Sequence, residues 1–461
     1  METDTQKKPL NFKLLAWVLV IGGLAPMLDT TIVNVAIPTL GHDLHTTVAL
    51  SQWTITGYLL AMGIIIPISG WLKERLGGKK LWLLALAFFL VGSVLAGASW
   101  NIDSMIVFRV IQGIGAGIIT PLVVTLLLEA AHGQPLGKLM ATVGLPIAIV
   151  PIFGPVVAGL ILNNFDWRWI FYVNVPIVIV GFMLAWWKLP KYEASPNKRI
   201  FDWLGFLQLA PAISLILYSL SQATGKDGFS SQDVWLPLIV GVVLTACFVA
   251  YSLRKKDPLI SLHAFRARSY SMSAIILFLS GLSVYGPLLL ISLFYQEVQH
   301  QTVLVTGLLL APQGIGSLIS RVAAGKLTDK IGSKPIILAG LALATLGTLP
   351  FAFATANTNE WFLAAALFVR GLGLTPITIA VMVGAFQGLP KEETANASST
   401  VRIIQQVGGS FGTAVLVLIL TQAALTHSLP SEAFNLAFWW SIGFVLLALV
   451  PALLLPKFVK K

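Results

Sequence analysis

Charged and reactive side chains are scarce in this 461-residue chain. Asp, Glu, Lys and Arg make up 11% of it, against about 25% in ordinary soluble domains, so a soluble surface cannot be built from them. The one cysteine, Cys247, excludes an intramolecular disulfide. The six histidines form no H-E-x-x-H pair, and no G-x-x-x-x-G-K-[ST] phosphate loop occurs. We therefore expect no metal and no cofactor. If this chain performs work that needs energy, we expect an ion gradient rather than ATP to supply it.

Long apolar runs lie between the few charges. Hydrophobic residues make up 56% of the chain, and stretches of about twenty residues cross a ~30 Å hydrocarbon core as helices. The runs do not alternate in polarity, which favours helices over a β-barrel. We predict an all-α polytopic membrane protein whose solvent is the lipid bilayer. Its fourteen predicted spans are residues 14–38, 48–72, 81–98, 104–130, 139–162, 169–189, 203–222, 235–253, 270–296, 303–327, 335–354, 361–387, 397–424 and 433–455.

Positive charge gathers in alternate connections between these spans. The net charge is +11, yet the odd-numbered connections hold only Arg168 and Lys226 of the basic residues. By the positive-inside rule, the even-numbered connections and both termini lie in the cytosol. The basic charge therefore indicates orientation in a membrane, which we expect to be the bacterial cytoplasmic membrane, and no nucleic-acid partner.

A short motif occurs twice, in corresponding connections. GWLKERLGGKK begins at Gly70 after the second span and GKLTDKIGSKP begins at Gly325 after the tenth, and both read G-x-L-x-[DE]-[RK]-x-G. Parallel repeats about an axis along the membrane normal are a transporter architecture, with the substrate site between the halves. We expect a six-helix bundle at residues 1–190, a linker with two additional spans at 191–268, and a second six-helix bundle at 269–461.

Further segments carry a family resemblance. They are LDTTIVNVAIP from Leu28, SQWTITGYLLA from Ser51, DWRWIFYVNVP from Asp166 and ASSTVRIIQQVGGSFGTA from Ala397. With the repeated motif, they make nearly the whole chain resemble the major facilitator superfamily, and within it the fourteen-span drug:proton antiporters. The resemblance implies two six-helix bundles plus two extra central helices. It also implies gating by the two motif loops, through Gly70, Glu74, Arg75, Gly77, Gly325, Asp329 and Gly332, with Glu74 where the family usually has Asp.

The predicted fifth span is rich in glycine and proline. Pro151, Gly154, Pro155 and Gly159 resemble the antiporter motif G-x-x-x-G-P-x-x-G-G, which implies a seal between the halves. Glycines let helices approach closely, and prolines bend a helix. Gly154 and Gly159 are five residues apart, about 140° around a helix, so they do not both face one partner. We expect Gly154 with Pro155 to make the contact between the halves.

One acid lies deep inside a predicted span. Asp29 is about fifteen residues, or ~22 Å, from the cytosolic end of the first span. A carboxylate at membrane depth costs about 2.5 to 3.5 kcal/mol, and such residues usually serve ion or proton pathways. An acid that only pairs two helices is the alternative. Arg109, in the fourth span, lies at a depth from which its side chain reaches Asp29, and the family resemblance implies a role in proton coupling for it.

Polar and aromatic residues inside the spans are candidates for a substrate cavity. Hydrogen bonds between helices explain buried amides equally well, and an interfacial belt explains tyrosines near helix ends. The family resemblance favours a cavity role for the tyrosines, since aromatic faces attract cations. Arg370 is the position related to Arg109 in the second half, whose spans hold no deep acid. The candidates are Asn34, Tyr58, Gln112, Tyr295 and Gln313.

Three functions remain, in falling order. They are export of small amphiphilic or cationic compounds by proton antiport, import of a solute by proton symport, and an enzyme within the membrane. The fifth-span motif and the two additional spans resemble antiporters and favour the first. Export of an endogenous metabolite or a lipid-like molecule is a further alternative. The expected partners of this chain, as a monomer, are a small-molecule substrate, protons and bilayer lipid.

Overall fold

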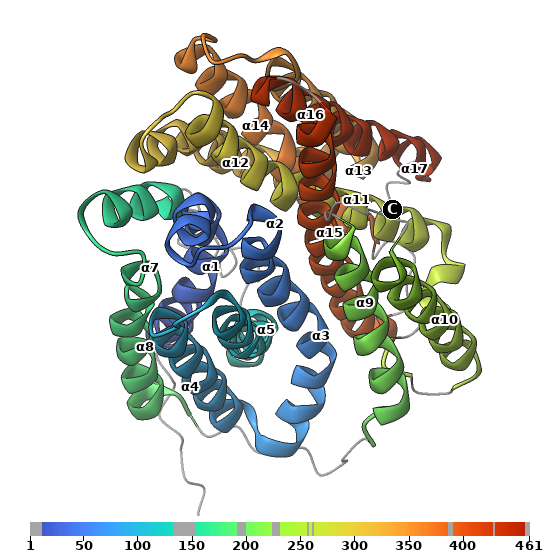
Figure 1. The fold of residues 1–461 in the computed structure, drawn as a ribbon. Coiled ribbons are helices and arrows are strands. Elements are labelled where there is room, and N and C mark those ends of the chain that lie inside the picture. Colours follow the sequence, from blue (N-terminus) through green and yellow to red (C-terminus); the bar gives the residue numbers. More distant parts are fainter. Residues whose placement is uncertain are drawn as a thin grey trace, which may run out of the picture.

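The computed structural model is built from helices (Figure 1). It describes residues 12–131, 153–190, 200–223, 231–255, 258–260, 262–385, 391–426 and 429–456. Within these ranges, 13 helices are long and apolar enough to cross a membrane, and each coincides with a predicted span. Of the predicted fifth span, the structure describes a shorter apolar helix, Phe153–Asn164. The all-α membrane fold is confirmed, whereas the count of fourteen spans stays a prediction.

The amino-terminal helices pack together around α5, in the blue to green part of Figure 1. Both α3 and α4 pack along α5, while α1 packs along α8 and α5. These elements are α1 (Phe12–Asp43), α2 (Val48–Ser51), α3 (Trp53–Leu76), α4 (Gly78–Gly97), α5 (Ile102–Ala131), α7 (Trp169–Tyr172) and α8 (Asn174–Lys188).

The carboxy-terminal helices repeat this arrangement. Both α12 and α13 pack along α14, as α3 and α4 do along α5, and α11 packs along α15. The elements are η2 (Leu262–Arg266), α11 (Arg268–Leu293), η3 (Phe294–Val298), α12 (Val303–Ile331), α13 (Ser333–Thr348), η4 (Leu349–Phe353), α14 (Glu360–Ala385), α15 (Lys391–Thr426), α16 (Pro430–Leu447) and α17 (Leu449–Leu454).

The two copies of the repeated motif adopt the same backbone turn. Gly77 ends α3 with φ 77°, and Gly332 ends α12 with φ 87°. Each glycine N–H donates to a carbonyl four residues earlier, that of Lys73 or Thr328, at 2.9 Å. A side chain is strained at such positive φ values, so the turn requires glycine. We call the face of the bundle that carries Gly77 and Gly332 the motif face.

The two additional spans lie beside the seam between α3 and α15 (Figure 1). They are α9 (Trp203–Gln222) and α10 (Gln232–Arg254), which pack against each other. Leu60 of α3, Ile213 and Leu217 of α9, and Ala414 of α15 form one buried apolar cluster. The helix pair therefore covers a contact between the first and second groups of helices.

Asp202, just before α9, ties this pair together. Its carboxylate accepts hydrogen bonds from Gly205 N at 3.0 Å, Tyr251 Oη at 2.7 Å, Lys255 Nζ at 2.8 Å and Leu259 N at 2.8 Å. Burial alone would raise the pKa of the Asp202 carboxyl, but these donors together hold that pKa below its ordinary value. The ionised form thus fastens the start of α9 to the end of α10.

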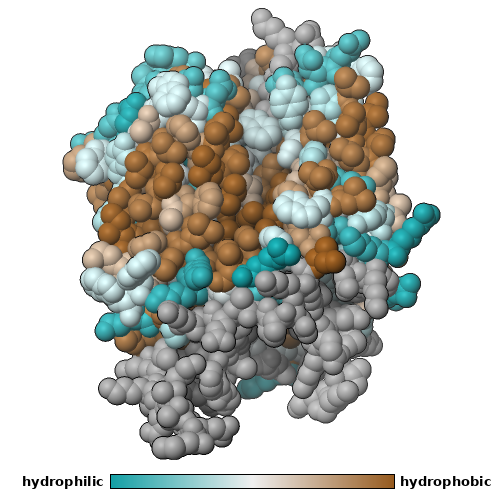
Figure 2. Space-filling view, turned by 90° about the horizontal axis from the view of Figure 1, so that it is seen from below, coloured by the Kyte–Doolittle hydropathy of each residue, from teal (hydrophilic) through white to brown (hydrophobic). Residues whose placement is uncertain are grey.

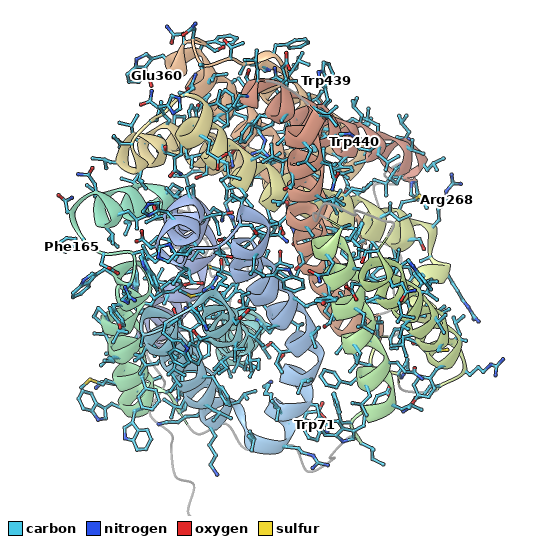
Figure 3. All side chains as sticks on the ribbon, in the orientation of Figure 1. Trp71, Phe165, Arg268, Glu360, Trp439 and Trp440 are labelled. Atoms are coloured by element: carbon cyan, nitrogen blue, oxygen red, sulfur yellow. The ribbon has the colours of Figure 1, made fainter. Side chains whose placement is uncertain are left out.

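Large apolar side chains cover the outside of the helices. On α10, Leu236, Ile239, Val242, Val243 and Leu253 are each more than half exposed. Figure 2 shows a brown expanse of hydrophobic residues with hydrophilic residues gathered beyond its edges. In Figure 3, the labelled tryptophans of α16, Trp439 and Trp440, lie at the edge of the bundle. A surface of this kind suits lipid as the solvent.

Candidate functional site

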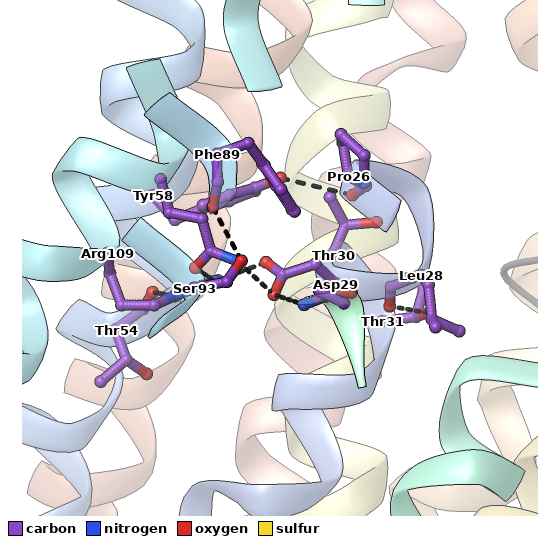
Figure 4. Close-up of polar contacts among 12 residues, drawn as sticks. Pro26, Leu28, Asp29, Thr30, Thr31, Thr54, Tyr58, Phe89, Ser93 and Arg109 are labelled. Carbon is purple, nitrogen blue, oxygen red and sulfur yellow. Dashed lines mark hydrogen bonds and ion pairs between the residues drawn. The ribbon is translucent and has the colours of Figure 1, made fainter. Parts of the chain in front are cut away.

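A buried ion pair joins α1 to α5 (Figure 4). Asp29 is 0% exposed and Arg109 is 1% exposed, and Arg109 Nη1 donates to Asp29 Oδ2. The predicted pairing of these two residues is present in the structure. Because neither charge reaches water, each depends on the other and on nearby hydrogen bonds for its stability.

Two side-chain amides complete the shell of Asp29. Its Oδ1 accepts hydrogen bonds from Gln112 Nε2 at 3.0 Å and from Asn174 Nδ2 at 3.1 Å. Gln112 Nε2 also donates to Ser93 Oγ at 2.9 Å. The carboxylate therefore has three donors, from α5 and α8, and residues of α1, α4, α5 and α8 meet in one cluster. Asn174 and Ser93 were not among the predicted site residues.

The Arg109 guanidinium makes further contacts with α3 and α5. Nε donates to the Thr54 carbonyl at 2.9 Å, and Nη1 also donates to Gln112 Oε1 at 2.6 Å. Its Cζ lies 4.2 Å from the centre of the Tyr58 ring, a cation–π contact. The Tyr58 hydroxyl donates to the Pro26 carbonyl of α1 at 3.3 Å. Arg109 is thus held on several sides.

Arg370 of α14 is held by neutral groups instead. It is 1% exposed and donates to Thr348 Oγ1 at 3.2 Å, to Gln313 Oε1 at 2.5 Å and to the Ser283 carbonyl at 2.5 Å. Within the described part of the chain, no carboxylate pairs with it. The two halves therefore share a buried arginine, and among the described residues its acidic partner is present only in the first.

The predicted cavity residues fall into two sets. Tyr58 and Gln112 lie in the Asp29 cluster, and Gln313 contacts Arg370. Asn34 instead donates to the Thr30 carbonyl of its own helix at 2.9 Å. Tyr295 is fully buried in an aromatic cluster, with its ring centroid 6.2 Å from that of Phe351. The structure thus joins three of the five candidates to the buried arginines.

The residues of the two motif loops differ in how closely other atoms surround them. A Cβ at Gly70 or Gly325 would meet no atom of the described residues within 4 Å. Arg75 is exposed, with its Cζ 4.5 Å from the Trp71 ring centre, and Glu74 is partly buried. The side chain of Asp329 lies outside the described residues. Among the described residues, both loops share one feature, the positive-φ glycine turn that ends α3 and α12.

The glycines of the helix Phe153–Asn164 face different partners. A Cβ at Gly154 would collide with Thr31 of α1, in the same half, whereas one at Gly159 would lie 2.6 Å from Leu304 Cα of α12, in the other half. A Cβ at Gly307 of α12 would in turn collide with the Pro155 carbonyl. We expected Gly154 with Pro155 to make the contact between the halves. Pro155 does lie against α12, but the expectation is wrong for Gly154, because the 140° offset turns Gly159 and not Gly154 toward α12. Pro151 lies outside the described residues.

Other contacts between the halves lie away from the motif face. Thr56 Oγ1, one turn into α3, is 3.0 Å from Thr413 Oγ1 of α15. Gln296 Nε2, beyond the end of α11, donates to the Val35 carbonyl of α1 at 3.1 Å. Together with the Gly159 contact, these join the halves at the face opposite the motif loops.

Known proteins place this architecture in a family. The model of the Major Facilitator Superfamily matches residues 19–413. The chain is 33% identical over 409 residues to the multidrug resistance protein B homolog of Mycobacterium tuberculosis (strain CDC 1551 / Oshkosh), covering 88% of this chain and 76% of that protein. It is 29% identical over 436 residues to the multidrug export protein EmrB of Escherichia coli (strain K12), with 93% and 85% covered.

Solved structures agree in fold. The D-xylose-proton symporter has a TM-score of 0.69 at 16% identity, covering 96% of this chain and 98% of that one. The nucleoside transporter NupG has a TM-score of 0.66 at 12% identity, with 96% and 99% covered. The chain therefore belongs to the Major Facilitator Superfamily, a family of membrane transporters.

Proposed function

We propose that this transporter exports small amphiphilic or cationic compounds in exchange for protons, with Asp29 as the proton carrier. The observation that carries the proposal is the buried cluster in which one acid is paired with Arg109 and held by amides. An ionisable residue at membrane depth is costly and is usually retained for an ion pathway. The names of the relatives, a multidrug resistance protein and a multidrug export protein, support the substrate class.

The charge of the cluster explains why exchange is favoured. With Asp29 ionised, its charge balances that of Arg109, so the cluster is neutral. With Asp29 protonated, the cluster carries one positive charge. A cationic substrate about 8 Å away would then be disfavoured by about 2 kcal/mol at an effective dielectric constant of 20. Proton and cation therefore compete, which is the condition for antiport.

The contacts between the two halves support alternating access, because they lie at one face of the bundle. The halves meet at the face opposite the motif loops, through the Thr56–Thr413 and Gln296–Val35 contacts. We assign the motif face and both termini to the cytosol of a bacterium, so this state is closed to the outside. We further assign Gly159 with Pro155 as the outer seal, and the two motif loops as the inner gate, in a protein that acts as a monomer with fourteen spans.

The test is transport by the purified protein in liposomes, with the membrane potential clamped and ethidium as the first probe. An acidic lumen drives accumulation inside if the protein is an antiporter, because protons leave as the dye enters. An alkaline lumen drives accumulation if it is a symporter. Antibiotics, sugars, amino acids and lipid-like compounds are then compared under the same two gradients. Accumulation only with an alkaline lumen would contradict the proposal.

A further inference from the structure

We propose that Asn174 positions Asp29 and reverses its hydrogen bond when Asp29 takes up a proton. This inference rests on the proposed role of Asp29 as the carrier. Asn174 begins α8 and is 0% exposed. Its Nδ2 donates to Asp29 Oδ1 at 3.1 Å. Its Oδ1 is also buried and accepts no hydrogen bond from the described residues. A buried acceptor without a partner calls for an explanation.

The helix packing places Asn174 opposite Asp29. α1 and α8 approach closely at Gly22 and Gly181, where a Cβ on Gly181 would lie 2.9 Å from Gly22 Cα. Asp29 is seven residues after Gly22, and Asn174 is seven residues before Gly181. Seven residues are about two helical turns, so each residue lies on the same face as its glycine. Two helices of opposite direction that cross at the glycines therefore bring the two side chains together.

Protonation changes what Asp29 needs from its neighbours. A carboxylate only accepts hydrogen bonds, whereas the carboxylic acid has one O–H to donate. Arg109 has no acceptor. Gln112 Oε1 already accepts from Arg109, and Ser93 Oγ accepts from Gln112 while donating to the Phe89 carbonyl at 2.8 Å. Among the described side chains that contact the acid, the one with a free acceptor is therefore Asn174, through Oδ1.

A half-turn of the Asn174 amide about its last side-chain bond exchanges nitrogen for oxygen. The amide then accepts the O–H of the protonated acid, with the proton still on Asp29 and no covalent bond broken. Asn174 thus serves both protonation states from one position. An aliphatic side chain would serve neither.

Few other charges act on the acid. Arg109 faces it from α5, and the Tyr58 phenol from α3 lies against Arg109, with the Tyr285 phenol of α11 close to Tyr58. The charged residues of α4 and α8 lie at their motif-face ends and are Lys79, Lys80 and Lys188. No second carboxylate among the described residues pairs with this cluster. Apart from Arg109, the side chains that donate to the acid are therefore the neutral amides of Gln112 and Asn174.

The test is an infrared titration of the purified protein, which needs no substrate. The carboxylic C=O band that disappears in Asp29→Asn belongs to Asp29. In Asn174→Ala, the carboxylate loses one donor and the protonated acid loses its acceptor. Because hydrogen bonds to an ionised group are roughly twice as strong as neutral ones, the carboxylate loses more, and we expect the pH midpoint of this band to move up by about one unit, a tenfold change. In the isosteric Asn174→Asp, the added charge should move the midpoint further up. Ethidium exchange should shift along the pH axis in the same order.

Asn435→Ala is the matched control. Asn435 lies near the start of α16, and its amide faces the carbonyls of Phe351, Ala354 and Ser431 rather than a carboxylate. Its loss should lower stability and leave the Asp29 midpoint unchanged. An unchanged midpoint in both Asn174 variants would overturn the inference while leaving the proposed function intact. Full uphill transport by Asp29→Asn would instead overturn the proposed function.

Discussion

Replacing Arg109 by lysine tests whether the geometry of the guanidinium matters as well as its charge. Arg109 donates to Asp29, to the Thr54 carbonyl and to Gln112, and it lies over the Tyr58 ring. Lysine keeps the charge but concentrates it at one ammonium, without the planar fork. That ammonium can retain Asp29 as its partner, but it cannot also reproduce the bond to Thr54 and the stacking on Tyr58.

The expected loss follows from these contacts. A hydrogen bond from a charged group contributes about 1.5 to 3 kcal/mol, and a desolvated cation–π contact contributes up to about 2 kcal/mol. A loss of about 3 kcal/mol in the transition between states lowers the rate roughly a hundredfold, since about 1.4 kcal/mol is a factor of ten. We therefore expect Arg109→Lys to be nearly inactive in proton-driven transport.

The assay is the initial rate of ethidium accumulation in liposomes with an acidic lumen, at equal amounts of folded protein. Arg168→Lys is the matched control, because Arg168 is 40% exposed and pairs with Asp166 at 3.2 Å on the surface. Exposed pairs contribute about 0 to 1 kcal/mol, so the control should transport like the wild type. Wild-type rates in Arg109→Lys would refute the geometric argument.

Three further predictions concern the seal, the turns and the linker. Gly159→Leu should separate the halves and cause a substrate-independent proton leak, measured with a pH-sensitive dye in the liposome lumen. Gly154→Leu should disturb packing within one half and cause no proton leak. Equal proton leaks in the two variants would contradict this assignment. Gly77→Ala should lower the unfolding free energy by about 1 to 3 kcal/mol, because its φ of 77° and ψ of 155° lie in a region that is essentially confined to glycine. Gly70→Ala has free space among the described residues and should not lower the unfolding free energy in the same denaturant titration. The lowered pKa of Asp202 means that the ionised carboxylate stabilises the fold at neutral pH, and this contribution should fade as pH falls through that pKa. Asp202→Asn should have a lower free energy of unfolding than the wild type at pH 7 and should lose less of it on acidification. The same pH dependence of the unfolding free energy in both proteins would contradict the argument.

Helix positions and the central ion pair were predictable from the sequence for a simple reason. Apolar length alone marks a span, and a charge within such a span stands out against its surroundings. Asp29 and Arg109 could then be matched by their depth. The repeated motif likewise marked two corresponding connections, and in the structure the last glycine of each copy, Gly77 or Gly332, adopts a positive φ.

Asn174 could not be found in this way. It is an uncharged residue near a helix end and 145 positions from Asp29 in the chain, so neither charge nor local spacing indicates its role. Asn174 lies in the DWRWIFYVNVP segment that carries the family resemblance, but that segment does not single it out. The spacing of Gly22 before Asp29 and of Gly181 after Asn174 is a second signal, and it becomes informative only when the pairing of α1 with α8 is known.

The orientation of the fifth-span glycines shows a related limit. Helical geometry fixed the 140° angle between Gly154 and Gly159, but it carried no information on which direction faces the other half. That depends on how the helix packs between α1 and α12, which is a property of the assembled bundle.

The most direct test of Asp29 as the proton carrier is to follow protons and probe together in liposomes that contain Asp29→Asn. Asp103→Asn is the control, because Asp103 is an exposed acid in the first turn of α5. We expect Asp29→Asn to lose proton efflux and uphill accumulation of ethidium while still exchanging ethidium down its own gradient, and Asp103→Asn to behave like the wild type. Uphill accumulation by Asp29→Asn at the wild-type rate, with protons moving in the opposite direction, would contradict the assignment of the carrier to Asp29.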